Sequence, residues 1–491
     1  MAHDLKATTV RSLFWKLFEQ GGSAAIQLVV QIVMARLLAP AEFGMLAIMT
    51  VFVNIGNVIV QSGLNTAIIQ SPDLDEDDCS TVFWMSLTIS CVLYLAIFAA
   101  APAVAQFYAM PAIVWPLRAL VLILIVNAYN AIQEALVARH MDFKKTFRAT
   151  VAAAAVSGVS AISAAVAGAG IWALVVQQLS FQLTKCVVLM AEVPWKPRLV
   201  FVAARAKTMF RFGWKLLVSG LIDQGYTSLS SLVIGHQFTG TDLGYVTQGE
   251  KYPQALGIVL DGAIQPVMLS AVSRVQDDKA RVKRLARRGL KTSTFLIVPA
   301  MGAFALVARP LVVLLLGEKW LPAVPFLQMY CLIYAFLPIH TTNLQVLNGM
   351  GKSDVFLRLE VIKKGIGVAM LCVTAFVIHD LNAIVVGYII NNVISTFINA
   401  EPNRKVIGYS YLEQVRDICP AFALTAASAA VAYPLALLGL PSLALILLQV
   451  LAMGAAYLLI ARLLGVEELA YLLANARTYL AGRRKSDQAG A

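Results

Sequence analysis

The stretch from residue 79 to residue 101, CSTVFWMSLTISCVLYLAIFAAA, contains no charged residue. A helix of about 20 residues spans a hydrocarbon core of roughly 30 Å, so this stretch predicts a transmembrane helix. Similar apolar runs recur from one end of the chain to the other. In lipid, only helices and closed barrels satisfy their own backbone, and these runs are too uniformly apolar for barrel strands, which alternate with period two. The predicted fold class is therefore an all-α polytopic membrane protein.

The composition agrees with this class. Charged residues make up 13% of the 491 residues, against about 25% in a soluble domain. The net charge of +12 does not indicate nucleic-acid binding, because the charges sit in short loops between hydrophobic runs, which is typical of membrane topology. The six cysteines are scattered singly, and no cysteine pair or Cys/His cluster is present. We therefore expect no metal site, no disulfide framework and no cofactor.

Turn residues between the apolar runs divide the chain into fourteen predicted transmembrane helices. The breaks include Ala39-Pro40, Ser71-Pro72, Gly168-Ala169-Gly170, the stretch from Pro194 to Pro197, and Gly240. The predicted spans are 12–38, 42–70, 79–101, 111–138, 146–168, 170–191, 211–236, 241–273, 290–316, 320–348, 353–378, 381–400, 414–437 and 441–463.

The distribution of basic residues gives the orientation. If the amino terminus is cytoplasmic, the inside segments collect 32 of the 39 Lys and Arg residues, and the outside loops hold only Arg36, Arg309 and Lys319. The positive-inside rule therefore places both termini in the cytoplasm. The segment 274–291 carries eight of the inside cations and is predicted to be an amphipathic linker on the inner leaflet. The acidic run from Asp73 to Asp78 is interpreted as a solvated, helix-capping loop in preference to a metal site.

An internal duplication organises the chain. Trp15-Lys16-Leu17 recurs as Trp214-Lys215-Leu216 at an offset of 199, and Glu42-Phe43-Gly44 recurs as Asp242-Leu243-Gly244 at an offset of 200. Six helices separate the copies, and six is even, so the halves are parallel repeats about an axis along the membrane normal. The predicted division is an N-lobe over 1–200, a C-lobe over 201–410, and two further helices with a cytoplasmic tail over 411–491.

Polar stripes recur inside the duplicated spans. The second span carries Asn54, Asn57, Gln61 and Asn65, and the eighth carries Glu250, Gln254, Asp261 and Gln265, each set on one helix face. At an offset of 200, three positions match, pairing 54 with 254, 61 with 261 and 65 with 265. Such a stripe avoids lipid by facing protein or water. It either joins helices through hydrogen bonds worth about 1 kcal/mol or less each, or lines a shared central cavity, which the recurrence favours.

Five motifs occur along the chain in a characteristic order: the stretch from Ala35 to Gly44, Gln61-Ser62-Gly63-Leu64, Ser80 to Trp84, Ala135 to Lys144, and Leu243-Gly244-Tyr245. In their order and spacing these motifs resemble the Wzx-type polysaccharide flippases of bacteria, of the multidrug/oligosaccharidyl-lipid/polysaccharide exporter superfamily. The resemblance covers about residues 10–465.

The resemblance implies two six-helix lobes around a central cavity, plus two more helices. It also implies that the protein moves an undecaprenyl-pyrophosphate-linked oligosaccharide to the periplasmic leaflet of the bacterial inner membrane, for polysaccharide or lipopolysaccharide synthesis, with other assembly proteins as candidate partners. Related lipid II flippases carry essential arginines in their first two helices. The matching positions here, near Val30-Gln31 and Asn57, are not cationic, so lipid II is the less expected substrate.

A sugar head group with a pyrophosphate needs polar groups and a few cations along its path, because a single ion at the bilayer centre costs several kcal/mol. The predicted substrate path comprises Lys16, Asn54, Asn57, Gln61, Arg118, Lys215, Lys251, Gln254 and Gln265. Each cation has an alternative: Lys16 and Lys215 as snorkelling helix-end lysines, and Arg118 as an interfacial anchor beside Trp115. Lys251 lies next to Glu250 in the sequence, and the alternative for this Glu–Lys neighbourhood is a purely structural role. Asp223, Glu250 and Asp261 are hypothesised to couple transport to protons or sodium, or, for the two aspartates, to pair with Lys251.

Two other functions remain open. A drug/cation antiporter of the same fold would favour an acidic cavity with aromatic contacts. A membrane glycosyltransferase, ligase or polymerase would need carboxylates or histidines on a sizeable outer loop, and the outer loops offer only the adjacent pair His379-Asp380. No phosphate-binding P-loop motif occurs, which argues against direct driving by ATP. The flippase is therefore the preferred interpretation, and the protein is expected not to be an enzyme.

Overall fold

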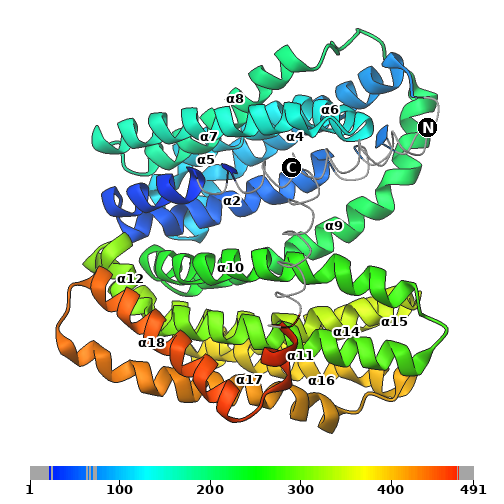
Figure 1. Cartoon of the computed structure of the whole chain (residues 1–491). Helices are drawn as coiled ribbons and strands as arrows, with labels where there is room; N and C mark the ends of the chain where they lie inside the picture. The colour runs from blue at the N-terminus through cyan, green and yellow to red at the C-terminus, as the bar shows by residue number, and fades with distance from the viewer. Residues whose placement is uncertain are drawn as a thin grey trace, which may run out of the picture. The chain divides into compact units, whose positions relative to one another are not determined.

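The computed structural model describes residues 22–474 of the chain apart from 24–25, 62–64, 66–67, 70–73 and 473. In this part of the chain every regular element is a helix (Figure 1). Twelve helices, or runs of consecutive helices, are long and apolar enough to cross a membrane, and a shorter apolar helix covers Ile26–Leu37. The chain is therefore a multi-pass α-helical membrane protein, which confirms the predicted class.

Each membrane-length segment overlaps a predicted span, with shifts of up to about ten residues at the ends. The twelve membrane-length segments are Pro40–Gln61, Glu76–Phe107, Pro111–His140, Phe143–Val166, Ile171–Glu192, Gly240–Ser273, Lys279–Leu306, Glu318–Gly349, Asp354–Ile378, Leu381–Ile407, Tyr411–Leu438 and Ser442–Leu463. The first predicted span overlaps Ile26–Leu37, and the seventh overlaps α9 (Ala203–Gln237). Neither is among the twelve, so a total of fourteen stays a prediction.

The chain divides into two compact units, residues 1–247 and 248–491. The sequence-based lobes follow the duplication instead, and their boundaries at 200 and 410 stay a prediction. The first unit contains α2 (Pro40–Gln61), α4 (Glu76–Phe107), α5 (Val114–Leu120), α6 (Ile123–His140), α7 (Phe143–Val166), α8 (Ile171–Glu192) and α9.

Helices α7 and α8 run side by side through most of their lengths (Figure 1). The buried face of α7 is built from small residues, among them Ala153, Ser157, Gly158 and Ala161. Small side chains let two backbones approach closely, which is the main source of packing energy between helices in lipid. The turn between the two helices is the predicted Gly168-Ala169-Gly170, whose two glycines have φ of 78° and 56°.

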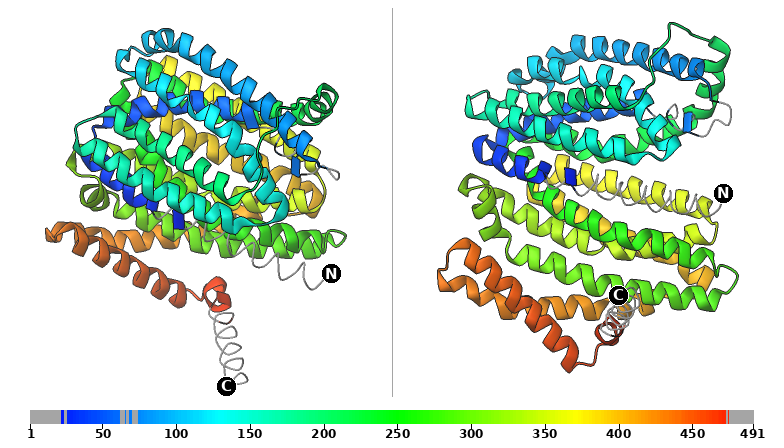
Figure 2. Two further views of the ribbon diagram at one scale, coloured as in Figure 1. Left: turned by 90° about the horizontal axis from the view of Figure 1, so that it is seen from above. Right: turned by 45° about the horizontal axis from the view of Figure 1, so that its top comes forward.

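Helix α10 (Gly240–Ser273) carries the chain from the first unit into the second. The second unit continues with α11 (Lys279–Leu306), α12 (Ala308–Leu315), α13 (Val324–Ala335), α14 (Leu337–Gly349), α15 (Ser353–Cys372), α16 (Leu381–Ile407), α17 (Tyr411–Ala432) and α18 (Ser442–Leu463). Helix α11 packs against α13, α14 and α17, and both further views show α17 and α18 following one another as a hairpin (Figure 2).

The prediction of a separate amphipathic linker at 274–291 is wrong for most of its length. Helix α11 already begins at Lys279, where the Asp278 side chain accepts a hydrogen bond from the Arg281 amide at 2.9 Å. Most of the basic segment therefore forms the first turns of a membrane-length helix. The physical reason is that acids on neighbouring elements pair with cations of this segment, such as Arg287. The membrane helix can therefore begin within the charged segment.

The duplicated motif forms equivalent helix starts. The Glu42 carboxylate accepts the Ala39 amide at 2.6 Å, and the Asp242 carboxylate accepts the Thr239 amide at 3.1 Å. The two starts also contact one another reciprocally within the first unit. A Cβ on Gly44 would lie 1.8 Å from the carbonyl oxygen of Gly240, and one on Gly244 would lie 2.1 Å from that of Pro40. Only glycine permits this approach at either position.

Candidate transport site

In the first unit, one residue of the predicted stripe on α2 joins two helices. The Asn127 side chain of α6 donates to the Asn57 carbonyl oxygen at 2.8 Å. Asn127 is buried, at 3% exposure, so this contact has the geometry of the interhelical amide bond that was the alternative to a cavity lining. Asn57 therefore has a packing role, whatever its part in transport.

Further polar contacts inside the first unit join α6 to α8. The Asn130 amide approaches the Gln182 side-chain oxygen at 3.5 Å, and Lys185 forms an ion pair with Glu134 at 2.6 Å. Asn127, Asn130 and Glu134 are spaced three and four residues apart, which places them on one face of α6. This is the same kind of spacing as in the polar stripe of α2, so the sequence carries a signal for this face of α6 as well.

Other predicted residues of the first unit lie differently. Asn54 is exposed and Gln61 half-buried. The Arg118 guanidinium donates to the Phe98 carbonyl at 3.1 Å and lies 4.1 Å from the Phe98 ring centroid and 4.8 Å from that of Trp115. These contacts favour the anchor alternative for Arg118.

Two predicted residues lie on α9, and one lies beyond the described part of the chain. Lys215 and Asp223 are both exposed on α9. Lys16 lies outside the described residues.

In the second unit, α10 carries two acids that face other helices. Glu250 accepts a hydrogen bond from the Tyr334 hydroxyl of α13 at 3.4 Å, and the Asp261 carboxylate faces Thr341 of α14. One carboxylate oxygen of Asp261 is buried and has no hydrogen-bond partner in the described protein. A buried carboxylate oxygen without a partner is suited to taking up a proton or a cation.

The remaining polar residues of α10 are exposed. Lys251, Gln254 and Gln265 all lie on accessible surface. Among the described residues, Lys251 forms no ion pair with Glu250 or Asp261. Neighbouring residues on a helix point about 100° apart, and ten residues add about 15 Å along the axis, so neither acid is within reach. The suggested pairing of Lys251 with Asp261 is therefore wrong.

A second polar network lies inside this unit and was not predicted. The His340 ring of α14 lies between Asn392 and Asn399 of α16, at 2.7 Å from the first and 2.9 Å from the second. Farther along α14, Asn343 receives a bond from Asn403 at 2.7 Å and donates to Gln414 of α17 at 3.0 Å. The asparagines of α16 follow at intervals of seven and four, a helical spacing that signals one shared face.

The acidic run before α4 confirms the helix-capping interpretation. Asp75 and Asp78 form a reciprocal capping box at the start of α4. Arg205 of α9 bonds both carboxylates, at 2.5 Å and 3.1 Å. The Arg205 hydrogen bond and the Asp78 backbone amide hold the pKa of Asp75 below its usual value. Asp73 lies outside the described residues. In the described part of the chain, no three His, Cys, Asp or Glu residues are grouped closely enough to hold a metal ion.

The intramembrane polar residues thus fall into two sets. One set bonds helices together within a unit, and the other, comprising Asn54, Lys251, Gln254 and Gln265, is exposed, with Gln254 also bonding Tyr334 of α13. Exposed amides and a cation on membrane-spanning segments are costly in lipid. They are therefore placed to contact water or a polar ligand.

Comparison with known proteins identifies the family to which the chain belongs. Residues 33–325, more than half of the chain, match the family model described as polysaccharide biosynthesis protein. A succinoglycan biosynthesis transport protein, ExoT, of Rhizobium meliloti (strain 1021) is 25% identical over 71% of this chain and 70% of its own length. A lipopolysaccharide biosynthesis protein, WzxC, of Escherichia coli (strain K12) is 22% identical over 88% of each chain.

Solved structures share the fold. The lipid II flippase MurJ in an inward closed conformation covers 92% of this chain and 99% of its own, with a TM-score of 0.72 and 12% identity. An inward-facing multidrug resistance MATE family transporter of the MOP superfamily covers 80% and 98%, with a TM-score of 0.63 and 15% identity. At these identities, the likeness concerns the fold alone.

Proposed function

The chain belongs to the polysaccharide biosynthesis protein family, and from this premise we propose that it is a flippase for lipid-linked oligosaccharides. Its substrate would be an undecaprenyl-pyrophosphate-linked oligosaccharide, moved from the inner to the outer leaflet of the bacterial cytoplasmic membrane by alternating access. The names of the relatives, which concern succinoglycan transport and lipopolysaccharide biosynthesis, support a substrate of this class. The family match carries the proposal.

The exposed polar set on α2 and α10 fits this substrate. Sugar hydroxyls lose their hydration in the membrane and require hydrogen-bonding groups that are not already used in packing. Asn54 and Gln265 are exposed amides of this kind, and Gln254 is exposed as well, although its side chain also bonds the Tyr334 hydroxyl of α13. Amides both donate and accept, so they match hydroxyls whatever the sugar.

The pyrophosphate requires cations. Lys251 is exposed on α10 and Lys215 on α9, and we assign both to phosphate contact, together with Lys16 by its equivalence in the repeat. Arg118 is the weaker candidate, because its guanidinium already bonds within the first unit. Asn57 and Gln61 extend the path on α2.

The energy source in this proposal is an ion. Asp261, with its unpartnered carboxylate oxygen, is the leading coupling residue, and Glu250 and Asp223 are the others. A proton or sodium bound at Asp261 would neutralise a charge that otherwise repels an anionic substrate. In this scheme both termini are cytoplasmic and the protein performs no covalent chemistry. The drug/cation antiporter is the less supported alternative, since the named relatives above belong to polysaccharide pathways.

The test is restoration of polysaccharide export in a strain that lacks this gene. Lys251→Gln and Gln254→Ala should each lower export at least about fivefold, because a lost bond to a charged group is worth about 1.5–3 kcal/mol and a lost neutral bond about 1 kcal/mol. The matched controls are Ile258→Ala and Val259→Ala, which alter apolar residues exposed on the same helix. Export unchanged in correctly inserted Lys251 and Gln254 variants would remove these residues from the path, and failure of the wild-type gene to restore export would remove the function.

A further inference from the structure

A cleft of about 910 Å³ lies in the second unit between α11, α17 and the segment that follows α18. This volume is within the usual range for a ligand site, about 300–1,000 Å³. Its α11 wall carries Arg284, Arg287, Arg288 and Lys291, spaced as i, i+3, i+4 and i+7, so one helix face presents all four cations. Arg416 of α17 adds a fifth.

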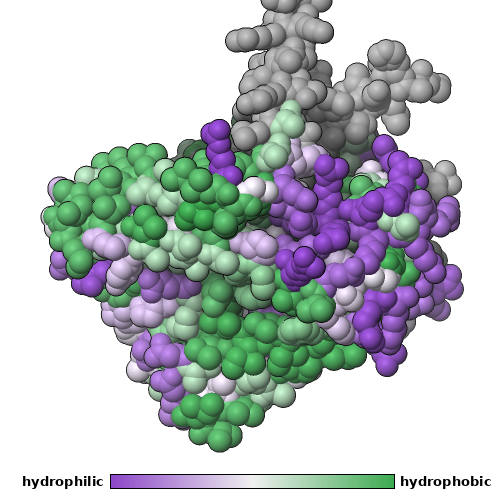
Figure 3. Space-filling model, turned by 60° about the horizontal axis from the view of Figure 1, so that its bottom comes forward, coloured by the Kyte–Doolittle hydropathy of each residue, from purple (hydrophilic) through white to green (hydrophobic). Residues whose placement is uncertain are grey.

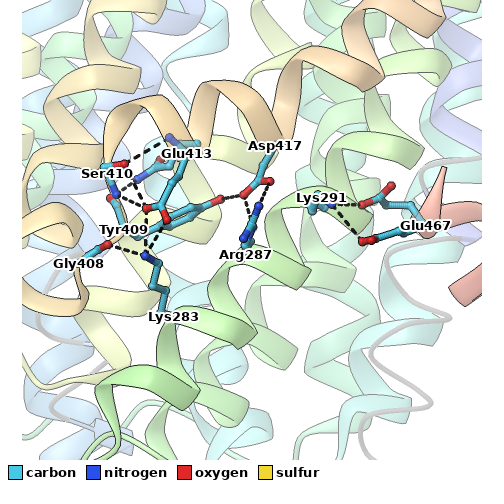
Figure 4. A network of polar contacts seen from close by, with 11 residues as sticks. Lys283, Arg287, Lys291, Gly408, Tyr409, Ser410, Glu413, Asp417 and Glu467 are labelled. Atoms are coloured by element: carbon cyan, nitrogen blue, oxygen red, sulfur yellow. Dashed lines mark hydrogen bonds and ion pairs between the residues drawn. The ribbon is translucent and has the colours of Figure 1, made fainter. Parts of the chain in front are cut away.

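Some of these charges are neutralised within the protein (Figure 4). Arg287 binds Asp417 through two nitrogens, at 2.7 Å and 2.8 Å, and the Tyr409 hydroxyl donates to the same carboxylate at 2.8 Å. Lys291 pairs with Glu468 at 2.9 Å and with Glu467 at 3.5 Å. These pairs fix the walls of the cleft and account for every acid that lines it.

Three guanidinium groups are left over. Arg284, Arg288 and Arg416 are exposed and form no ion pair with any described residue. The Arg288 guanidinium carbon lies 3.8 Å from the Tyr471 ring centroid, a stacking contact that orients the planar group and leaves its edges free to donate. The cleft lining therefore has three guanidinium groups outside ion pairs and, with five cations against three acids, a net charge of +2. Arginine is the residue type that binds phosphate oxygens in pairs.

Both walls change from charged to apolar in the same direction. On α11 the cations are followed by Phe295, and on α17 Arg416 is followed by Ala421 and Leu424. Phe295 and Leu424 belong to one buried cluster, and Lys283 at the start of α11 bonds Glu413 at the start of α17, so the two helices run in parallel. The cleft is cationic at its end and apolar along its depth.

This amphipathic arrangement matches a lipid. The helix starts that form the cationic end carry basic segments that the positive-inside rule assigns to the membrane surface, and Figure 3 shows hydrophilic side chains gathered at one side of a face that is otherwise largely hydrophobic. A phosphate group at the cations would place an attached hydrocarbon chain along the apolar wall. Basic pockets between transmembrane helices bind anionic lipid head groups in this way.

We infer that this cleft binds the phosphate head group of a membrane lipid through Arg284, Arg288 and Arg416. The site shares no residue with the exposed polar set on α2 and α10 and does not depend on the proposed substrate. Two sources offer the same chemistry: an anionic phospholipid of the bilayer, and a polyprenyl phosphate carrier.

The test is native mass spectrometry of the full chain in detergent with added lipids. The probes are cardiolipin and phosphatidylglycerol for the phospholipid source, undecaprenyl phosphate for the carrier source, and phosphatidylcholine as the zwitterionic control. The key variant replaces Arg284, Arg288 and Arg416 together by glutamine. Because none of the three is in an ion pair, the variant should fold, and its melting curve without added lipid should lie close to that of the wild type, lowered only by the lost contact between Arg288 and Tyr471.

The matched control replaces Arg274, Lys279 and Arg281 by glutamine. These three exposed cations lie at the same end of α11 and do not line the cleft, so the net charge changes equally. We expect anionic lipid binding to weaken at least about tenfold in the cleft variant and less than about twofold in the control, since each guanidinium–phosphate contact is charge-assisted. A variant with lysine at the three cleft positions should retain part of the binding.

The lipid whose binding follows this pattern identifies the source. Equal binding in the cleft variant and the control variant would overturn the inference, because the lipid would then respond only to overall charge. Binding of phosphatidylcholine as tightly as cardiolipin and undecaprenyl phosphate would also overturn it, because the surplus cations would then have no role.

Discussion

Replacing Arg287 by methionine should destabilise the protein more than replacing its partner Asp417 by asparagine. The Asp417 side chain is 2% exposed, whereas the Arg287 side chain is 45% exposed. Without Arg287, the buried carboxylate keeps only the Tyr409 hydroxyl of its three hydrogen bonds. Without the Asp417 charge, the guanidinium turns to water and the asparagine still accepts from Tyr409.

The magnitudes follow from this asymmetry. Leaving a buried charge without its partner costs about 3–5 kcal/mol, and the partial exposure of the pair places Arg287→Met near the lower end, at about 3 kcal/mol. Asp417→Asn removes the charge from the bonds to Arg287 but leaves no buried charge without a partner, so it should cost about 1 kcal/mol. In the double variant no buried charge remains, so it should be more stable than Arg287→Met alone.

The assay is equilibrium unfolding of the purified chain by sodium dodecyl sulfate in mixed micelles, carried through the complete double-mutant cycle. The coupling between the two sites should be about 2 kcal/mol. Equal costs for the two single variants, or a double variant less stable than Arg287→Met, would refute the reasoning from burial.

Three further predictions concern other parts of the fold. Gly44→Ala should greatly reduce the yield of folded protein, because its Cβ would overlap a backbone oxygen, whereas Gly225→Ala on α9, with nothing within 4 Å of the added atom, should be tolerated; similar yields would contradict the close approach. Asn57→Ala should lower stability by about 1 kcal/mol, because it removes the partner of a buried amide on α6; unchanged unfolding curves would contradict the bond. The pKa of Asp75 lies below its usual value because of Arg205, so this pair contributes stability above the ordinary aspartate pKa and loses it as pH falls through the lowered pKa; Arg205→Gln should flatten stability against pH in that acid interval, and an unchanged profile would contradict the assignment.

The membrane helices were predictable because the thickness of the hydrocarbon core sets the length of an apolar run. Helix α8 differs from its predicted span by one residue at each end, and the glycines before it have the positive φ that a tight turn requires. The start of α11 is not predictable from charge alone, because a run of basic residues is equally typical of a surface segment. Charged residues at a helix end stay in the helix when acids of a neighbouring element pair with them. Here the partners are Glu413 and Asp417, and the sequence alone does not identify them.

Site residues were less predictable because adjacency in sequence is not contact. Lys251 follows Glu250 directly, yet Glu250 faces Tyr334 and Lys251 is exposed. The helical repeat turns neighbours about 100° apart, and which direction faces a cavity depends on packing partners that no local pattern specifies. The polar face of α6, formed by Asn127, Asn130 and Glu134, is different, because its spacing of three and four residues can be recognised in the sequence.

The most direct measurement is movement of a lipid-linked oligosaccharide between leaflets by the purified chain in proteoliposomes. A labelled undecaprenyl-pyrophosphate oligosaccharide is incorporated in both leaflets, and a membrane-impermeant reagent attacks the head groups on the outside. The account predicts that the reagent consumes nearly all of the label in vesicles that contain the protein and only the outer-leaflet share in protein-free vesicles. In vesicles with the Lys251→Gln variant, consumption of the inner-leaflet share should be at least about fivefold slower than with the wild type. Consumption limited to the outer-leaflet share in every preparation, with the protein folded and inserted, would contradict it.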